Sequence, residues 1–197
     1  MKRGVQRFIP IIFVLVIIAL IIAAAVSVVR IFTGGGGEPT TSVTDTSSQA
    51  LLSTTADRKV RMTVRGQIVG EETFRSYQIT VSPSSRTFIR SKGYTQTPLV
   101  SKVYDNNVKA YDEFVHALNL ANLPKGTQLA GPADDTRGLC AAGVLYEFEI
   151  LSGDSVGKRL WTTSCPGSKG SLAGDVGQLQ QLFLAQIPDA GEYIGKD

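Results

Sequence analysis

Cys140 and Cys165 are the only two cysteines of the 197-residue chain, and His116 is its only histidine. A nucleophilic thiol needs a reduced cysteine beside a base, which here would be a Cys165–His116 dyad. A structural disulfide would instead use both cysteines and leave no reactive thiol. The outcome depends on whether the fold brings the cysteines together and on the redox state of the compartment.

The positions of the two cysteines favour a disulfide. Cys140 begins one alternating apolar segment and Cys165 ends the next, with turn-forming residues 152–157 between them. In an antiparallel hairpin, the numbers of facing residues have a constant sum. The sum is 305 for the cysteines and 309 if Leu151 faces Lys158, so the cysteines nearly face each other. We therefore predict a Cys140–Cys165 disulfide and no catalytic residue.

The sequence indicates neither a metal nor a cofactor. Zinc needs about four clustered Cys, His or carboxylate ligands, and neither CxxC nor HxxxH occurs here. Residues 152–159, SGDSVGKR, lack the first glycine and the final Ser or Thr of a phosphate-binding loop, which favours a hairpin turn. Asp134 and Asp135 are candidate calcium ligands, but the spacing of an EF-hand is absent. We predict no cofactor and no bound metal.

Glu147 and Glu149 lie two residues apart and therefore share one face of a predicted strand. A glycoside hydrolase uses paired carboxylates, but within a deep cleft. A small domain leaves little room for such a cleft, so we interpret both glutamates as solvent-exposed. We predict that the protein is not an enzyme, and a small cell-envelope hydrolase is the less favoured alternative.

Basic residues are concentrated in the first half of the folded region. From Arg58 to Lys109 there are ten Lys or Arg and three Asp or Glu, a balance of +7, while residues 110–197 hold six and eleven, a balance of −5. The outer face of the first hairpin is expected to hold three of these arginines. The candidate anion-binding residues are Arg61, Arg65, Arg75, Arg86, Arg90 and Lys92. These residues could bind an anionic envelope polymer, lipid headgroups or, less favoured, a nucleic acid. The alternative is a solvated strand face whose charges suppress edge-to-edge aggregation.

The N-terminal part contains a candidate membrane segment. Residues 8–29 are an uncharged run of 22 residues rich in Ile and Val. A helix of this length spans roughly 33 Å, which is enough for a hydrocarbon core of about 30 Å. The apolar region of a cleavable signal peptide, the alternative, is typically about 7–15 residues long. We predict an uncleaved signal anchor over residues 8–32 of a single-pass membrane protein.

The charges beside this segment predict its orientation. Lys2, Arg3 and Arg7 precede it, and only Arg30 follows it closely. Positive residues stay inside, so residues 1–7 are expected in the cytoplasm and the rest outside, in a periplasmic or extracellular space. That location permits the disulfide.

Two further regions follow the predicted anchor. Residues 33–57 are rich in Gly, Ser and Thr and are expected to form a flexible linker, with 49–52 a candidate helical turn. Residues 58–197 have the length of one domain.

The domain alternates between two periodicities. Residues 59–69 and 73–81 read as a hairpin, 86–91 as a candidate third strand, and 140–151 with 158–165 as a second hairpin. Two helices are expected, one capped within 105–107 and one starting near Asp175. The inward residues are expected to be Val60, Met62, Val64, Ile68, Tyr77, Ile79, Val81, Val144, Tyr146, Phe148 and Ile150 on strands, and Val108, Tyr111, Phe114, Val115 and Leu118 on the first helix. This order predicts an α+β domain, with an antiparallel sheet of two hairpins packed against two helices.

Residues 143–170, GVLYEFEILSGDSVGKRLWTTSCPGSKG, and the helix expected from Asp175 resemble part of the secreted subtilisin-inhibitor family. The likeness lies in a hairpin whose second strand ends in Cys-Pro, followed by a glycine-containing loop and a helix, and covers under a third of the chain. The family implies a second cysteine within that helix and a second disulfide, but DVGQLQQLFLAQI contains no cysteine. No reactive loop can be placed on the sequence.

Together these features predict a membrane-anchored extracytoplasmic binding domain whose ligand the sequence does not identify. Another envelope protein and an anionic polymer are the candidate partners. A tethered protease inhibitor is the alternative function that the local resemblance supplies.

Overall fold

The computed structural model describes residues 46–167 and 170–195. The predicted cytoplasmic tail, the membrane anchor at 8–32 and the linker up to residue 45 lie outside these residues. Within the described ranges, no helix combines the length and apolar character needed to cross a membrane.

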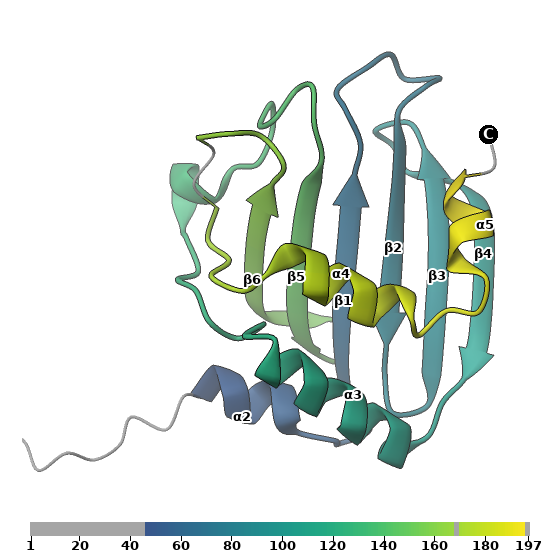
Figure 1. Ribbon diagram of the computed structural model, residues 1–197, viewed down its shortest axis with the longest axis vertical. Helices are drawn as coiled ribbons and strands as arrows, with labels where there is room; N and C mark the ends of the chain where they lie inside the picture. The colour runs from purple at the N-terminus through teal and green to yellow at the C-terminus, as the bar shows by residue number, and fades with distance from the viewer. Residues whose placement is uncertain (1–45, 168–169, 196–197) are drawn as a thin grey trace, which may run out of the picture. The chain divides into compact units, whose positions relative to one another are not determined.

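Six antiparallel strands form one sheet in the order β4-β3-β2-β1-β5-β6 (Figure 1). The strands are β1 (Arg58–Arg65), β2 (Arg75–Val81), β3 (Ser85–Lys92), β4 (Thr97–Asp105), β5 (Leu145–Ser152) and β6 (Ser155–Thr163). The first four form a meander, and the hairpin β5–β6 joins the other side of β1. The predicted α+β class with an antiparallel sheet is therefore confirmed, although the sheet is larger than two hairpins.

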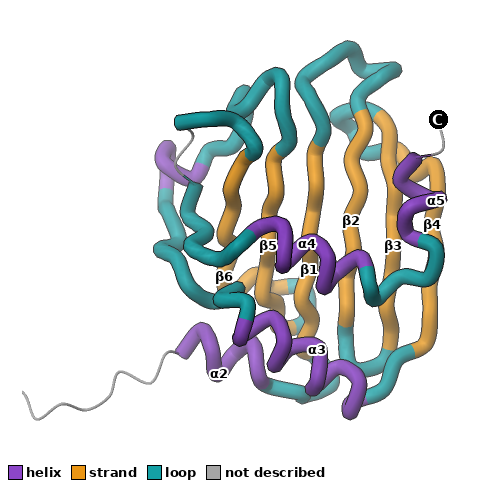
Figure 2. The backbone as a smooth tube through the Cα atoms, in the orientation of Figure 1, coloured by secondary structure: helices purple, strands orange, loops and turns teal. Residues whose placement is uncertain are grey.

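Four α-helices within the described ranges lie over one face of this sheet (Figures 1 and 2). They are α2 (Thr46–Leu52), α3 (Val108–Leu120), α4 (Val176–Leu184) and α5 (Ala190–Gly195). Two of them, α3 and α4, are the predicted helices, and their N-caps are Asn107 and Asp175, whose side chains accept from the backbone N–H groups of Ala110 and Gln178. The opposite face, which we call the open face, has no helix of α2–α5 over it.

The apolar core lies between the sheet and the helices. Most of the residues predicted to face inward are buried there: Val60, Met62, Val64, Tyr77, Ile79, Val81, Phe148, Ile150, Tyr111, Phe114, Val115 and Leu118. Val108, the first residue of α3, is 55% exposed instead of facing the core. The period of the strands and helices therefore identified the buried face.

Strand β4 was not predicted because its sequence, TPLVSKVYD, lacks a buried face. Seven of its nine residues are exposed. A strand without a buried face does not need alternating apolar residues, and that alternation is the pattern by which a strand is predicted. Its pairing with β3 includes a register shift between Arg90 and Ser91. The strand exists because β3 offers it a ladder of backbone hydrogen bonds.

The folded region begins before Arg58, in the segment expected to be a flexible linker. Helix α2 packs against α3, and its Leu51 is completely buried in the core. Lys158 of β6 donates to Ser47 Oγ at 3.0 Å, which ties the helix to the sheet. Residues 46–57 are therefore part of the domain, because Leu51 of this mostly polar segment is buried in the core.

Both hairpin turns differ from the predicted ones. β1 ends at Arg65, so Ile68 lies in the loop 66–74 and is 44% exposed instead of facing the core. The β5–β6 turn is Gly153–Asp154, shorter than the expected 152–157, and Gly153 has a φ of +57°. Glycine adopts this left-handed conformation without the strain that a Cβ would add.

We predict that Leu51→Ala lowers the free energy of unfolding of residues 46–197 by about 2–5 kcal/mol, because it empties a core position. Urea unfolding followed by circular dichroism measures the change. Leu120→Ala is the matched control, since Leu120 is 81% exposed and its loss should change the value by no more than about 0.5 kcal/mol. Equal effects of the two substitutions would show that α2 contributes nothing to the core.

Candidate functional site

The two cysteines form the predicted disulfide, with a Cα–Cα distance of 5.4 Å between Cys140 and Cys165. A Cβ placed on Gly143 would lie 2.5 Å from Cys140 Sγ and 3.0 Å from Cys165 Sγ, so a glycine is needed beside the bridge. The bridge links Cys140, which precedes β5, to Cys165, which follows β6. It thereby fixes the segment that ends at Cys140. No thiol is available in the described chain for nucleophilic chemistry.

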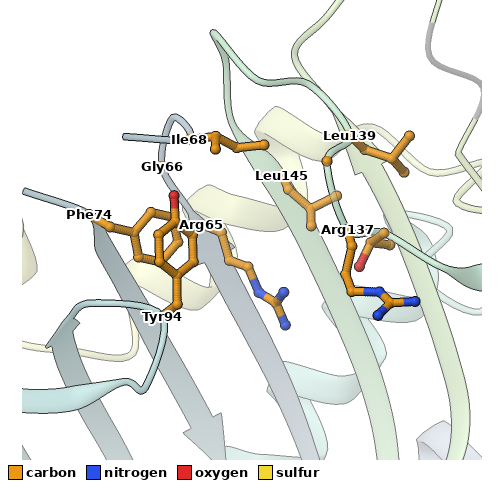
Figure 3. A pocket seen from close by; sticks show the side chains of 10 residues that line it. Arg65, Gly66, Ile68, Phe74, Tyr94, Arg137, Leu139 and Leu145 are labelled. Atoms are coloured by element: carbon orange, nitrogen blue, oxygen red, sulfur yellow. The ribbon is translucent and has the colours of Figure 1, made fainter. Parts of the chain in front are cut away.

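An apolar hollow of about 260 Å³ lies on the open face at the end of the sheet where β1 ends (Figure 3). We call it the loop-end hollow. Its lining residues are Arg65, Gly66, Ile68, Phe74, Tyr94, Thr136, Arg137, Gly138, Leu139 and Leu145. They come from β1 and β5, from the loop 66–74, from the β3–β4 turn and from residues 136–139.

Tyr94 fixes two of these segments to each other. Its hydroxyl donates to the Val69 carbonyl at 2.8 Å and accepts from the Val69 N–H at 3.1 Å. Its backbone N–H donates to Glu71 Oε2 at 2.9 Å. Its ring stacks on Phe74, with centroids 4.2 Å apart (Figure 3). The β3–β4 turn and the loop 66–74 therefore form one continuous wall.

The segment 136–141 forms the opposite wall. The Ile68 N–H donates to the Ala141 carbonyl at 2.8 Å, and Cys140 next to it is held by the disulfide. Earlier in the chain, Asp134 at the end of the 3-10 helix Gly131–Asp134 accepts a hydrogen bond from Trp161 Nε1 at 3.0 Å. The hollow is thus a built feature, because hydrogen bonds and a covalent bridge hold its walls.

An ion-pair network crosses the open face beside this wall. It shows that the prediction of solvent-exposed Glu147 and Glu149 is wrong. Glu147 is not solvated: its side chain is 6% exposed and lies between Arg65, whose Nη2 is 3.0 Å from Oε2, and Arg159. Glu149 pairs with Arg61 at 2.6 Å and is 14% exposed. A buried carboxylate requires such partners. The sequence pattern missed this because it could not show that Arg159 of β6 and residues 134–136 would lie together beside Glu147.

Two further ion pairs complete the network. Arg159 Nη1 lies 2.9 Å from Asp134 Oδ1, and although burial opposes its charge, the carboxylates of Glu147 and Asp134 raise the pKa of Arg159. Arg137, at the rim of the hollow, donates from Nε to Asp135 Oδ1 at 2.9 Å. Hydrogen bonds from Arg137 lower the pKa of Asp135 to about 2. Each cation named here is thus paired with a carboxylate.

The six candidate anion-binding residues do not share one face. Arg61 and Arg65 lie on the open face, in the ion pairs described above. The other four lie on the helix-covered side: Arg75, Arg86, Arg90 and Lys92. Arg90 is paired with the core residue Tyr77 and therefore shares its face. The other three are an even number of residues from Arg90 or Tyr77 along their strands, so they share that face as well. Arg75 therefore does not stand beside Arg61 and Arg65, contrary to the expectation for the outer face of the first hairpin.

The four basic residues on the helix-covered side have different environments. Arg90 is 5% exposed and lines, with Arg75, a cavity of about 200 Å³. Arg86 donates to the carbonyls of Asp105 and Gln186 at 2.9 Å and 3.0 Å. Lys92 is exposed at the end of β3. No common anion site containing all six residues is formed.

The remaining candidates for chemistry do not line the hollow. His116 is on α3, where its Nδ1 is 2.8 Å from the Asp112 carbonyl oxygen. Asp134 and Asp135, the candidate calcium ligands, each pair with an arginine. Within residues 46–167 and 170–195, no three His, Cys, Asp or Glu side chains gather in a way that could hold a metal ion.

Comparisons with known proteins do not add a family. No family model matches the chain, and a search of curated proteins finds no similar sequence. The resemblance of residues 143–170 to part of the subtilisin-inhibitor family therefore rests on those residues alone.

We predict that Glu147→Ala destabilises residues 46–197 by about 3 kcal/mol, because it leaves Arg65 and Arg159 without their shared carboxylate in a partly buried site. Urea unfolding measures the loss. Glu113→Ala, at an exposed position of α3, is the matched control and should change stability by no more than about 0.5 kcal/mol. A Glu147 variant as stable as this control would contradict a structural role for the network.

Proposed function

We propose that this protein is a single-pass, membrane-anchored binding domain that presents the loop-end hollow outside the membrane to an apolar side chain of a protein partner. The observation that carries the proposal is the hollow itself, about 260 Å³ in volume and walled by Ile68, Phe74, Tyr94, Leu139 and Leu145. Concave apolar sites with a few polar groups at the rim are the usual form of ligand pockets.

The size and the rim of the hollow support a protein partner. Ile68, Val69 and Tyr94 are 44%, 40% and 49% exposed, so an apolar surface continues from the hollow onto the loops around it. Exposed apolar patches of this kind mark interaction surfaces. A leucine or aromatic side chain from a partner would fill the hollow, while its neighbours contact the exposed rim.

The charge distribution favours a neutral ligand group over an anionic polymer. Arg65 and Arg137 line the hollow, but Glu147 and Asp135 pair with them. Arg61 on the same face pairs with Glu149. An anionic polymer would have to compete with carboxylates that are already in place, whereas an apolar side chain needs no such exchange.

The same features support binding over catalysis. Both cysteines are used in the bridge, and the acids and bases around the hollow are held in ion pairs. A general acid or base needs a pKa near the working pH, and the pKa of Asp135 is held at about 2.

The location outside the cell membrane rests on two observations. The sequence contains the uncharged run at residues 8–29 with basic residues before it. The disulfide needs an oxidising compartment to persist.

We predict that N-acetyl-leucinamide, used as a neutral apolar probe, shifts the amide resonances of Arg65, Ile68, Tyr94 and Leu145 in an ¹⁵N spectrum of residues 46–197. Ile68→Ser should weaken this binding by about tenfold, because it removes one apolar wall. Leu120→Ser is the matched control, since Leu120 is equally apolar but lies on α3.

Heparin serves as the anionic probe in the same titration. The proposal expects shifts at the hollow with N-acetyl-leucinamide and none that depend on salt with heparin. Salt-dependent heparin binding with no response to N-acetyl-leucinamide would overturn the hollow as the binding site and favour the anionic polymer.

We also predict that the full chain stays in the membrane fraction after extraction with alkaline carbonate, and that protease added from outside digests residues 46–197. Alkylation of the denatured chain before reduction should label neither Cys140 nor Cys165, and after reduction both. A chain recovered in the cytosol with two alkylated thiols would contradict the proposed location and leave the hollow unaffected.

A further inference from the structure

The sheet has two edge strands, β6 and β4, which the described residues cover unequally. On β6, the Trp161 N–H donates to Ser171 Oγ at 2.9 Å, and the Trp161 carbonyl accepts from the N–H groups of Ser171 and Leu172. The Arg159 N–H donates to Gln128 Oε1 at 3.1 Å. Loop segments therefore occupy the outer side of β6.

Strand β4 lies at the opposite edge of the sheet (Figures 1 and 2). The direction of its backbone groups follows from the neighbouring ladder. The Gly93 N–H donates to the Phe74 carbonyl, so Gly93 is directed towards β2. Because backbone groups alternate along a strand, Arg90 and Phe88 are directed the other way, towards β4.

The partners of Arg90 and Phe88 on β4 are Val100 and Lys102, which therefore bond to β3. The alternate residues Ser101 and Val103 direct their N–H and C=O groups outward, to the edge of the sheet. Within residues 46–167 and 170–195, no backbone group outside the strand ladders bonds to these outward groups. Val103 is also 67% exposed, the largest value for an apolar residue of this strand.

Three features commonly protect an edge strand, namely proline, lysine and a bulge. On β4 they leave the second half unprotected. Pro98 and the register shift beside Val100 affect only its first part. Lys102 does not guard the edge, because its Nζ lies 5.5 Å from the centre of the Tyr193 ring of α5 in the same molecule. Residues 101–104 thus form a regular, open edge, whereas the Asp105 carbonyl already accepts from Arg86 Nε and Nη2.

We propose that β4 pairs antiparallel with β4 of a second copy of this chain, with Val103 opposite Val103 of the second copy. Only an extended backbone supplies the alternating donors and acceptors that this edge needs. A second copy carries the same row of groups, which become complementary when one copy is turned by a two-fold rotation. The paired strands would join two six-stranded sheets into one.

The side chains select the register of this pairing. A register with Ser101 opposite Val103 brings Lys102 opposite Lys102, and like charges in that position repel. A register with Ser101 opposite Ser101 extends the pairing to the shifted part of the strand and to Pro98, which has no N–H. The Val103 register uses residues 101–105 alone.

The Val103 register also matches side chains. It brings the two most exposed apolar side chains of the open edge together, and their contact removes them from water. Lys102 then lies opposite Tyr104 of the second copy, and Ser101 lies opposite Asp105, whose carboxylate accepts a hydrogen bond from a hydroxyl.

The test is oxidative cross-linking of Val103→Cys in the full chain, purified in detergent. The two Cα atoms of a directly opposed, hydrogen-bonded pair are about 5.5 Å apart, which suits a disulfide. We expect most of the variant to become a covalent dimer on oxidation. Ser101→Cys is the register control, because its two copies would be offset by about 13 Å along the strands, too far for a disulfide. Leu120→Cys on α3, where Leu120 is 81% exposed, reports random collision.

A second measurement does not depend on cysteine chemistry. Val103→Pro removes the outward N–H and keeps the bonds of Val100 and Lys102 to β3, so sedimentation should show dimerisation weakened by about tenfold or more. Val103→Thr keeps the N–H and the branched side chain and should dimerise nearly as well. Unchanged thermal unfolding would show that each variant is folded.

Cross-linking of Val103→Cys above both cysteine controls, together with the effect of proline, would support the proposal. It is overturned if Ser101→Cys cross-links more strongly, if neither exceeds Leu120→Cys, or if the chain sediments as a monomer at every concentration. It is equally overturned if Val103→Cys, oxidised in cells, joins a protein of another mass instead of its own copy. None of these outcomes depends on ligand binding in the loop-end hollow.

Discussion

The structure depends on the burial of one apolar face of the central strands. Met62 of β1, Ile79 of β2 and Phe148 of β5 are directly aligned across the sheet, and all are at most 1% exposed. Apolar area removed from water contributes about 25 cal/mol per Å², so these side chains require a cover. Helices α3 and α4 supply it with Leu118, Leu179 and Phe183.

A sheet covered on one side leaves its polar face towards solvent, and this protein covers part of that face as well. The segment after α3 passes β6 and brings Asp134 against Trp161 and Arg159. Glu147 then loses contact with water and needs the two arginines beside it. The charges of this part of the open face therefore compensate one another within the molecule, and the lining of the neighbouring hollow is mainly apolar.

The disulfide connects these two requirements. Cys140 lies at the end of the segment that walls the loop-end hollow, and Cys165 follows β6. The bridge, the Ile68–Ala141 hydrogen bond and the stack of Tyr94 on Phe74 hold three separate segments around one space. The hollow on the open face and the uncovered edge of β4 are different surfaces, so the two proposed contacts do not compete for the same residues.

The sequence by itself determined the α+β class, most inward residues of the strands, the N-cap Asp175, the range 105–107 that contains the other N-cap, and the disulfide, since each depends on local periodicity or on spacing along one hairpin. Only the tertiary structure decided the rest. The ion pairs of Glu147 with Arg65 and Arg159 join three strands, and the hollow joins residues from 65 to 145. Strand β4 forms because it pairs with β3, although its own residues are mostly exposed. Leu51 is buried because the folded domain provides a core position for it. Local patterns record which face of an element is buried, but they carry no record of which distant segment covers it.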